Sequence, residues 1–299
     1  MFDARRLLVL RELAARGTVT AVAGALNYSP SAVSRQLAVL EEEMGTALLE
    51  ASGRRVRLTP AGEALVRRAG PILEQMERAE SEVSVLASES QELSGRLRVA
   101  AFQTVLLDVI PMALERLAHL HPRLRVETGR LEPEDALPAL SAHEYDLVLE
   151  EEYPSRPGPR RAGVTLRQVM TDEMVLAVPK SWTRVPLREL AEHPWVMEPA
   201  GSAARDWATQ ICREAGFEPE VRHVSDDMLV QLSLVRRGHA AAFVPETVVP
   251  HAPSGVAVEH LPGRPRRTVF SVVRAGGSTH PACTAFHEAF EHAVDRLHR

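Results

Sequence analysis

Hydrophobic residues recur at helical spacing in three short stretches of the first sixty positions, and an alternating stretch follows them. The first stretch predicts a helix over residues 2–14 that ends at Gly17. A short second helix is expected to bury Val22, Ala23 and Leu26 and to begin at Thr18 or Thr20. The N-terminal region is therefore predicted to be a compact set of helices followed by a strand pair.

The third stretch carries the clearest helix signals. Ser29 suits the N-cap and Pro30 the first helical position. One apolar stripe at i, i+4, i+7 and i+11 is formed by Val33, Leu37, Leu40 and Met44. The opposite face presents Ser31, Ser34 and Arg35, and such short hydroxyl side chains beside an arginine fork suit a helix that enters a DNA groove. The alternative is a solvated face.

Residues 48–59 alternate in polarity and predict a hairpin that turns at Ser52-Gly53. Arg54, Arg55 and Arg57 lie at or near its tip, where a strand pair can rest against the DNA backbone. Together with the helices, this pattern indicates a helix-turn-helix followed by a wing. Thr20 and Ser29, at helix starts, are further candidates for phosphate contact.

From Pro60 to Leu86 the apolar positions step by four and three, which is a heptad seam that predicts a partner helix. The seam consists of Leu65, Ala69, Ile72, Met76, Ala79, Val83 and Leu86. Pro71 is expected to bend the helix. A homodimer is the favoured interpretation, and packing of the helix on its own chain is the alternative. The polar residues 87–95 are expected to form a hinge.

The remaining residues alternate between strand and helix patterns, as in an α/β sheet. Strands are expected at 97–101, 124–128, 146–149, 174–178, 195–197, 221–224, 241–244 and 269–273, and helices at 104–119, 133–142, 187–192, 203–215, 228–237 and 281–297. Pro and Gly cluster at 153–163 and 276–281, which we interpret as crossovers between two subdomains. The last helix is then expected to return to the first subdomain.

The chain resembles the LysR-type transcriptional regulators over essentially its whole length. The resemblance is carried by Gly17-Thr18-Val19-Thr20, Ala23, Leu26, Ser29, Ala32-Val33-Ser34-Arg35-Gln36-Leu37, Leu40-Glu41, Gly45, Leu58-Thr59-Pro60-Ala61-Gly62, Gly95-Arg96-Leu97-Arg98-Val99, Ile110-Pro111, His121-Pro122 and Tyr145-Asp146-Leu147. Three places depart from the family pattern, and the first is Val22, where Ala is usual in the second helix. Pro30-Ser31 stands where Gln-Pro is usual, and Leu48-Leu49-Glu50-Ala51 lacks the aromatic residue and the arginine of the usual Leu-Phe-x-Arg.

The resemblance implies an α/β multidomain protein in three parts. These are a winged helix-turn-helix over 1–59, a linker and dimerisation helix over 60–90, and an effector domain over 91–299 that resembles periplasmic binding proteins. Subdomain I would comprise about 91–162 and 276–299, and subdomain II about 163–275. A small effector in the cleft would alter binding or bending of promoter DNA, a dimer of dimers would form, and RNA polymerase is a further expected partner.

Candidate effector residues lie where strands end and helices begin, because such places gather polar groups around a cleft between α/β subdomains. They match the family's pocket by their order along the chain: Phe102, Gln103, Thr104, Thr128, Glu150, Glu198, Gly201, Ser202 and Phe243. Glu150 and Glu198 favour a cationic or donor-rich ligand, and the alternative is that either caps a helix or faces solvent. No resident cofactor or metal is expected.

The charge of the chain bears on the DNA-binding hypothesis only through its placement. The 299 residues carry a net charge of −5, but residues 1–60 hold eight arginines against six acidic residues, so the remainder carries −7. The acidic excess therefore belongs to the effector half, and affinity for DNA should fall steeply with salt. Two cysteines and the lack of a long apolar run argue against a disulfide framework and a membrane span and favour a cytoplasmic protein.

Two rival functions remain open on the residues alone. His287 and His292 suggest a zinc helix, but a spacing of five rotates the second histidine about 140° from the first. Catalytic glycine motifs are absent as well, so an enzyme is disfavoured. Residues 95–299 alone would suit a solute-binding module, which the attached N-terminal helices argue against.

Overall fold

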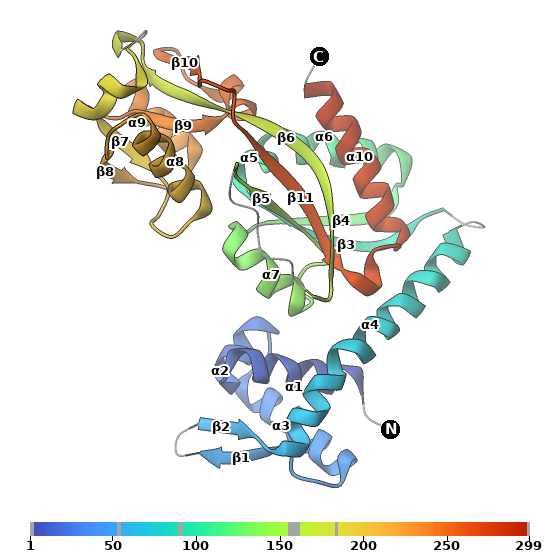
Figure 1. Ribbon diagram of the computed structural model, residues 1–299. Helices are drawn as coiled ribbons and strands as arrows, with labels where there is room; N and C mark the ends of the chain where they lie inside the picture. The colour runs from blue at the N-terminus through green and yellow to red at the C-terminus, as the bar shows by residue number, and fades with distance from the viewer. Residues whose placement is uncertain (1–2, 53–54, 89–91, 155–161, 183–184, 298–299) are drawn as a thin grey trace.

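The structure is a computed structural model that describes residues 3–52, 55–88, 92–154, 162–182 and 185–297 (Figure 1). It has three parts along the chain. A small helical domain with a strand pair comes first, one long helix follows, and an α/β body forms the rest. Among the described residues, no helix is both long and apolar enough to cross a membrane.

The N-terminal domain consists of α1 (Ala4–Arg16), α2 (Val19–Ala25), α3 (Pro30–Met44), β1 (Leu49–Ser52) and β2 (Arg55–Leu58). Side-chain oxygens of Asp3, Thr18 and Ser29 accept hydrogen bonds from backbone N–H groups at the three helix starts. Thr18, rather than Thr20, is thus the cap of α2. The shared core contains the expected stripe of α3 down to Leu40, whereas Met44 is exposed.

The long helix α4 (Pro60–Ser88) begins directly after the wing and contains Pro71. Thr59 fixes its start, because its hydroxyl donates to the carbonyl of Ala47 at 2.8 Å and accepts from the N–H of Gly62 at 3.1 Å. A side chain at Gly62 would lie 2.2 Å from the carbonyl oxygen of Leu48. The Leu-Thr-Pro-Ala-Gly run therefore packs the helix closely against the first wing strand.

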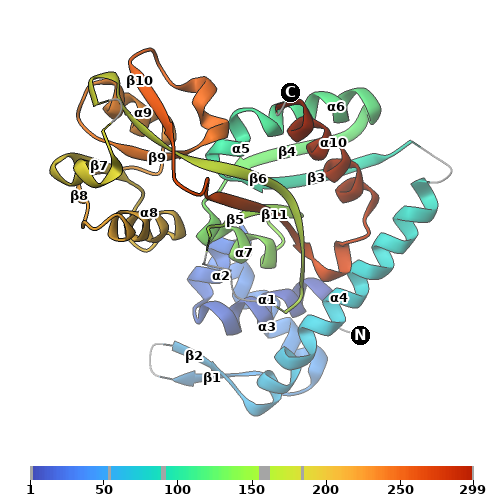
Figure 2. The ribbon, with the colours of Figure 1, turned by 45° about the horizontal axis from the view of Figure 1, so that its top comes forward.

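Subdomain I of the α/β body is a sheet covered by helices on both faces (Figures 1 and 2). It is built from β3 (Ser94–Ala101), β4 (Arg123–Arg130) and β5 (Leu147–Glu152), with α5 (Gln103–Leu107), α6 (Val109–Leu120), α7 (Pro133–Ser141) and α10 (Pro281–Leu297). Parallel β3 lies between β4 and β5, α6 and α10 share one core with the sheet, and α7 packs on the other face. The last helix therefore returns to subdomain I.

Subdomain II is smaller and contains a second core around Trp195 and Trp207. Its elements are β7 (Pro194–Met197), α8 (Ala203–Glu214), β8 (Glu220–Val224), α9 (Met228–Arg236), β9 (Ala242–Pro245) and β10 (Val256–His260), with single 3-10 turns at Lys180–Trp182, Leu187–Glu192 and Glu246–His251. Strands β7 and β8 pair in parallel, and β9 and β10 pair with β6 (Val164–Pro179).

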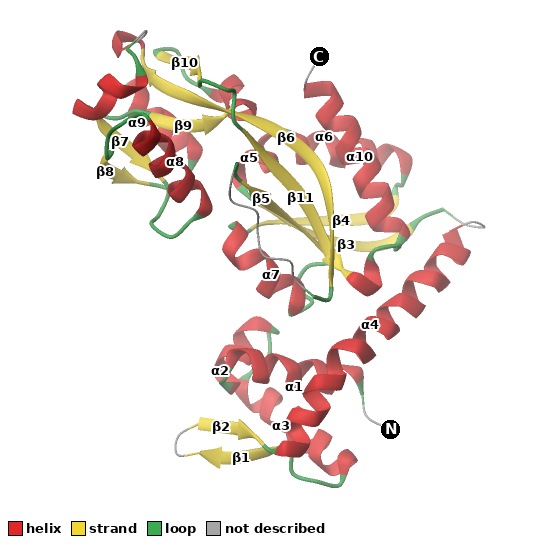
Figure 3. Ribbon diagram, in the orientation of Figure 1, coloured by secondary structure: helices red, strands yellow, loops and turns green. Residues whose placement is uncertain are grey.

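Two long strands join the subdomains (Figure 3). Antiparallel β6 and β11 (Arg266–Arg274) have their inner halves in the core of subdomain I and their outer residues beside subdomain II. Met170 belongs to the first core and Met174 to that beside Trp195, so β6 crosses between these residues. Continuous strands therefore make the passage, and 276–281 follows β11 within subdomain I instead of crossing between subdomains. Most of the other expected crossover, 153–163, lies outside the described residues.

Other differences from the expected elements have local causes. The helix expected at 104–119 breaks at Asp108, because Pro111 has no N–H for the carbonyl of Leu107 and its ring clashes there. The segment Leu187–Glu192 is a 3-10 helix rather than an α-helix. Strand β10 was not expected, since its residues alternate too weakly to distinguish it from a loop.

Candidate DNA interface and effector cleft

The outer face of α3 is exposed and carries the three predicted groove residues. Ser31, Ser34 and Arg35 all face solvent, on the side opposite buried Val33 and Leu37. The two hydroxyls have internal partners: Ser31 lies 3.0 Å from the hydroxyl of Ser29, and Ser34 donates to the carbonyl of Pro30 at 3.0 Å. Arg35 makes no hydrogen bond or ion pair with any described residue, so its guanidinium is available to a ligand.

The acidic residues near α3 are held away from this face. Glu41 turns inward and accepts from the N–H groups of Leu48 and Leu49 at 2.8 and 3.0 Å. Glu43 pairs with Arg6 of α1 at 2.5 Å. Two of the three carboxylates at the C-terminal end of α3 are therefore bonded within the domain, while Glu42 is exposed at the end of the helix away from Ser31 and Arg35.

The wing is the two-stranded hairpin β1–β2, with Glu50 opposite Arg57 in register. Arg57 is exposed and Thr20 is exposed on α2. Arg54 lies outside the described residues, and Arg55 is placed only as a residue of β2. The structure therefore gathers Ser29, Ser31, Ser34 and Arg35 at one helix start and leaves Arg57 on a separate surface.

The heptad seam of α4 divides into two halves. Leu65, Ala69 and Leu73 are buried in the core of their own N-terminal domain, and Ile72 packs against it. By contrast, Met76, Val83 and Leu86 are 46%, 66% and 67% exposed, and Ala79 is exposed too. Leu65 and Ala69 thus follow the alternative of packing on their own chain, and only the second half of the seam is open to a partner.

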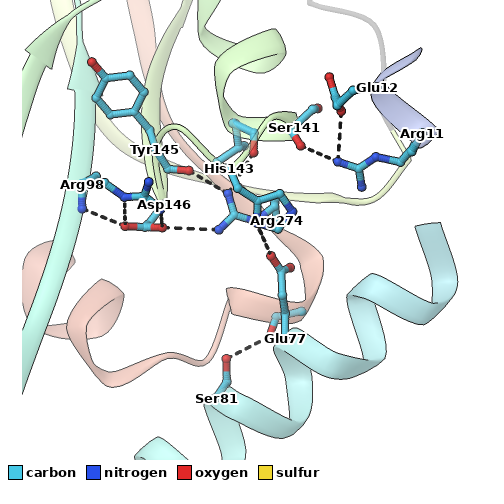
Figure 4. Close-up of polar contacts among 12 residues, drawn as sticks. Arg11, Glu12, Glu77, Ser81, Arg98, Ser141, His143, Tyr145, Asp146 and Arg274 are labelled. Carbon is cyan, nitrogen blue, oxygen red and sulfur yellow. Dashed lines mark hydrogen bonds and ion pairs between the residues drawn. The ribbon is translucent and has the colours of Figure 1, made fainter. Parts of the chain in front are cut away.

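A joint connects α4 with the effector domain, and we define it by Glu77, Ser81, His143, Asp146, Arg274 and Gly276 (Figure 4). Glu77 of α4 pairs with Arg274 at the end of β11. Arg274 also donates to the carbonyls of Leu140 and Tyr145 at 2.9 and 2.7 Å, and buried Ser81 donates to the carbonyl of Gly276 at 3.0 Å. The joint fixes the second half of α4 against subdomain I.

Two titratable groups of the joint are shifted. Burial, with the charges of Arg274 and Arg11, lowers the pKa of His143 to about 3, so this histidine is neutral although its Nδ1 lies 3.3 Å from Glu77. Burial alone would raise the pKa of Asp146, but the hydrogen bonds and charge of Arg98 bring it below its usual value. Arg11 of α1 donates to the carbonyl of Ser141, which brings the N-terminal domain into the same contact region.

The cleft between the subdomains contains a buried charge cluster around Arg267 of β11. This guanidinium is 2% exposed, donates to Glu151 at 2.6 Å and to Asp172 at 2.7 Å, and lies over the ring of Phe102. It also donates to the hydroxyl of Thr104 at 2.8 Å. Phe102 and Thr104 therefore lie at the strand end and helix start that hold Arg267.

Gln103 closes the cleft instead of lining an open pocket. Its amide nitrogen donates to Asp227 at 3.0 Å, and its amide oxygen accepts from the N–H of Met228 at 2.7 Å. Because Gln103 begins α5 in subdomain I and Met228 begins α9 in subdomain II, these bonds cross the cleft. Arg130 adds a second crossing contact to Asp226 at 3.5 Å.

Thr128 and Glu150 are two of the predicted effector residues that do not line the cleft cavity. Strand β4 runs on to Arg130, so Thr128 is not at its end and instead lines a groove beside Asn27 of the N-terminal domain. Strand β5 runs on to Glu152, and Glu151, not Glu150, binds Arg267. Both placements have one physical cause, since each strand is longer than expected and neither residue therefore stands at a strand end.

A small cavity of about 20 Å³ lies on the subdomain II side of the cleft. It is lined by Tyr153, Met174, Val196, Met197, Glu198, Ala204, Trp207, Ala208, Met228, Gln231, Phe243 and Pro245. Glu198 and Phe243 are the two predicted effector residues among them. Gly201 is exposed, and Ser202 caps α8 by accepting from the N–H of Arg205 at 3.1 Å.

Glu198 is the unusual group of this cavity. Burial and the nearby negative charge of Glu151 raise the pKa of its carboxyl to about 8. Its side chain has no hydrogen-bond or ion-pair partner within the described part of the chain. Arg205 donates at 3.0 Å to the backbone carbonyl of Glu198, so the cation beside this residue does not pair with its carboxyl.

Sequence reasoning missed Arg267, Asp172, Glu151, Tyr153 and Trp207. A signal existed for Asp172, which interrupts an apolar strand and is 2% exposed. Charged residues inside an apolar run are expected to pair when buried. The partners, however, lie far apart along the chain and could not be read from local pattern.

Only one group of possible metal ligands occurs among the described residues. Glu173, Glu246 and His260 bring ligand atoms within 4.8 Å of one another. His260 and Arg264 already contact Glu173, at 2.7 and 3.5 Å, so an arginine cation offsets the carboxylate that a metal would need. His287 is buried against Ser271 and does not join His292, which is exposed.

Two protein families match this chain, one in each half. The family "Bacterial regulatory helix-turn-helix protein, lysR family" matches residues 4–63, and the family "LysR substrate binding domain" matches residues 90–295. The HTH-type transcriptional regulator ClcR of Pseudomonas putida is 29% identical over 251 residues, which are 82% of this chain and 83% of ClcR.

Two further likenesses agree. A probable hydrogen peroxide-inducible genes activator of Mycobacterium avium is 30% identical over 263 residues, which are 85% of this chain and 82% of that protein. A full-length OxyR variant from Pseudomonas aeruginosa has the same fold, with a TM-score of 0.68, 21% identity, and coverage of 97% of this chain and 95% of that one.

Proposed function

Because this chain belongs to the LysR family of bacterial DNA-binding transcriptional regulators, we propose that α3 reads promoter DNA while a small molecule in the cleft controls the outcome. The observation that carries the DNA-reading surface is the exposed start of α3, where Arg35 has no described partner beside Ser31 and Ser34. A planar guanidinium suits two acceptors of a guanine, and the hydroxyls suit phosphates or bases. Thr20, Ser29 and the arginines 54, 55 and 57 complete the proposed interface.

The effector arm of the proposal rests on the cleft. Gln103 and Arg130 bond across it, and Phe102, Thr104, Glu198 and Phe243 lie within it. A ligand that binds one cleft opening better than another shifts the balance between openings. Arg274, at the far end of β11 from Arg267, then links the cleft to α4 through Glu77.

The proposed assembly is a homodimer that uses the second half of the α4 seam, Met76, Ala79, Val83 and Leu86. Their exposure supports it, because apolar side chains at heptad spacing gain stability by packing on a partner helix. Two recognition helices would then read half-sites about 34–36 Å apart. From the family we further infer a dimer of dimers, contact with RNA polymerase, and a place in the cytoplasm where the DNA is.

The test of DNA reading uses the full chain and a DNA fragment from the intergenic region beside its own gene. Arg35→Ala should cost about 1–3 kcal/mol of binding for each half-site and leave the dimer intact. Arg188→Ala, an exposed arginine of subdomain II, is the matched control. Equal affinity of Arg35→Ala and wild type at fixed salt would remove α3 from the interface.

The test of the assembly is the mass of the particle in solution. Leu86→Glu should convert the dimer to a monomer, because a charge in the seam would be buried without a partner. Arg67→Glu, on the exposed side of α4, is the control. A dimer that survives Leu86→Glu would contradict the seam.

A further inference from the structure

The cavity of subdomain II has walls of a particular kind. The rings of Tyr153 and Trp207 lie 5.5 Å apart, and Trp207 meets Phe243 edge-on at 5.5 Å. Met197 and Met228 supply polarizable sulfur beside them. Aromatic faces attract a cation through the negative charge of the ring face, and this attraction strengthens where water is excluded.

The cavity also has acceptors but no positive charge. Glu198 lines it without a partner in the described chain, and Gln231 uses its amide nitrogen on the carbonyl of Ser225 at 2.8 Å, which turns the amide oxygen to other donors. Two guanidinium groups lie near the cavity: Arg205 donates to the backbone carbonyl of Glu198 at 3.0 Å, and Arg267 is bonded to both Glu151 and Asp172. Three carboxyl groups therefore stand against two cations when Glu198 is ionised, and neither cation bonds to the carboxyl of Glu198.

The volume sets the size of the group that fits. About 20 Å³ holds one group the size of a water molecule. A primary ammonium head has that size and three donors, whereas a carboxylate or phosphate would add negative charge to a site that already has an excess of it. Met228, whose N–H is bonded to Gln103, lines the cavity, so the cavity adjoins the contacts that cross the cleft.

We propose that the effector is a primary amine, whose ammonium head occupies this cavity between Glu198 and the rings of Tyr153, Trp207 and Phe243. The proposal rests on the proposed function in taking the cleft as the effector site, and it adds the chemical class of the ligand. Ionised Glu198 pairs with the ammonium group, Gln231 accepts a second N–H, and the rings surround the head and its first methylene.

The test measures binding of n-butylammonium to the full-length protein by tryptophan fluorescence and by thermal melting. Its neutral analogue 1-butanol and its anionic analogue butanoate are the probes for comparison. We expect saturable binding of n-butylammonium alone. Glu198→Gln should weaken it at least tenfold and Phe243→Leu by about three- to tenfold, while exposed Glu189→Gln leaves it unchanged.

The pH profile separates ion pairing from a structural role. The pKa of Glu198 is about 8 without ligand, so its proton must leave when an ammonium group binds. Affinity should therefore rise up to about tenfold per pH unit from pH 6 to 8 and level off above it, since alkylamines stay protonated to about pH 10. Glu198→Gln should lose this slope even where its melting curve shows a fully folded protein.

The outcomes divide clearly. Preference for butanoate, equal binding of 1-butanol, or unchanged affinity in a folded Glu198→Gln variant overturns the amine proposal. DNA binding without any probe is measured in parallel on the same protein. If that binding is specific and the amine does not bind, the regulator assignment stands and the ligand class is wrong. If specific DNA binding is absent, the proposed function fails. The binding experiment with n-butylammonium then still shows whether the cavity takes an amine.

Discussion

The two ends of strand β11 each carry an arginine, and the two arginines work under opposite conditions. Arg267 is 2% exposed in the cleft and has two carboxylate partners that are themselves buried. Arg274 has a side chain 15% exposed at the joint and spreads its bonds over one carboxylate of α4 and two backbone carbonyls of subdomain I. The first arginine neutralises charges, and the second connects parts of the chain.

The pKa values of titratable groups near the two ends of β11 are shifted in opposite directions. At the cleft, burial raises the pKa of Glu198 to about 8, so its contribution to stability is present at acid pH and is lost as pH rises from the unfolded value toward 8. At the joint, burial lowers the pKa of His143 to about 3, so its contribution is present above about pH 6.5 and is lost as pH falls toward 3. Acid therefore favours the folded state at the cleft, through Glu198, and opposes it at the joint, through His143.

The largest expected effect is at the cleft. Arg267→Met keeps the apolar stem but leaves Glu151 and Asp172 as buried charges without a cation. We expect the free energy of unfolding to fall by about 3–5 kcal/mol, measured by urea denaturation at pH 7. Arg266→Met, at the exposed neighbouring position, should change it by less than about 0.5 kcal/mol. Similar losses in both variants would show that burial does not distinguish the two arginines.

A smaller effect is expected at the joint. Glu77→Gln removes the charge that pairs with Arg274 while the helix and its shape are retained. We expect a loss of about 1–2 kcal/mol in docking of the helix, seen as faster amide hydrogen exchange in the second half of α4. Glu74→Gln, whose partner Arg78 lies on the same helix, is the control and should leave exchange unchanged. Equal protection in both variants would mean that Arg274 does not hold α4.

The acid response of the joint can be isolated at His143. The backbone φ of His143 is 57°, a left-handed conformation that asparagine tolerates, so His143→Asn should fold normally. Between pH 6 and 4 the wild type should lose up to about 1 kcal/mol of stability per pH unit more than the variant, because only the wild type takes up a proton on unfolding. Parallel pH curves from denaturant titrations would disprove the assignment.

The smallest effect is expected from oxidation. Cys212 and Cys283 are buried in the separate cores of the two subdomains, and burial raises the pKa of each thiol to about 12. Because the thiolate is the reactive form, we expect hydrogen peroxide to change neither DNA binding nor thiol count in the folded protein. This holds although one relative is a probable hydrogen peroxide-inducible genes activator. Thiol titration before and after denaturation measures it, and loss of a thiol from the folded protein would refute it.

The parts of the fold that could be predicted from the sequence are those whose cause is local. The start of α3 at Ser29 and Pro30 and its buried stripe depend on neighbouring residues, and the structure has both. The cluster around Arg267 could not be predicted, because its partners Thr104, Glu151 and Asp172 come from three other elements. The α4 seam is intermediate, since spacing predicts an apolar face but not which half of it the chain itself covers.

Gly276 gives the joint a property that charge does not describe. A Cβ at this position would lie 2.4 Å from the carbonyl oxygen of Glu74 and 2.7 Å from the Cβ of Glu77. The closest approach of the effector domain to α4 therefore depends on the absence of one methyl group. A Gly276→Ala substitution would therefore push α4 and the effector domain apart at the joint. It should weaken communication between them, while each part still folds and binds its own ligand.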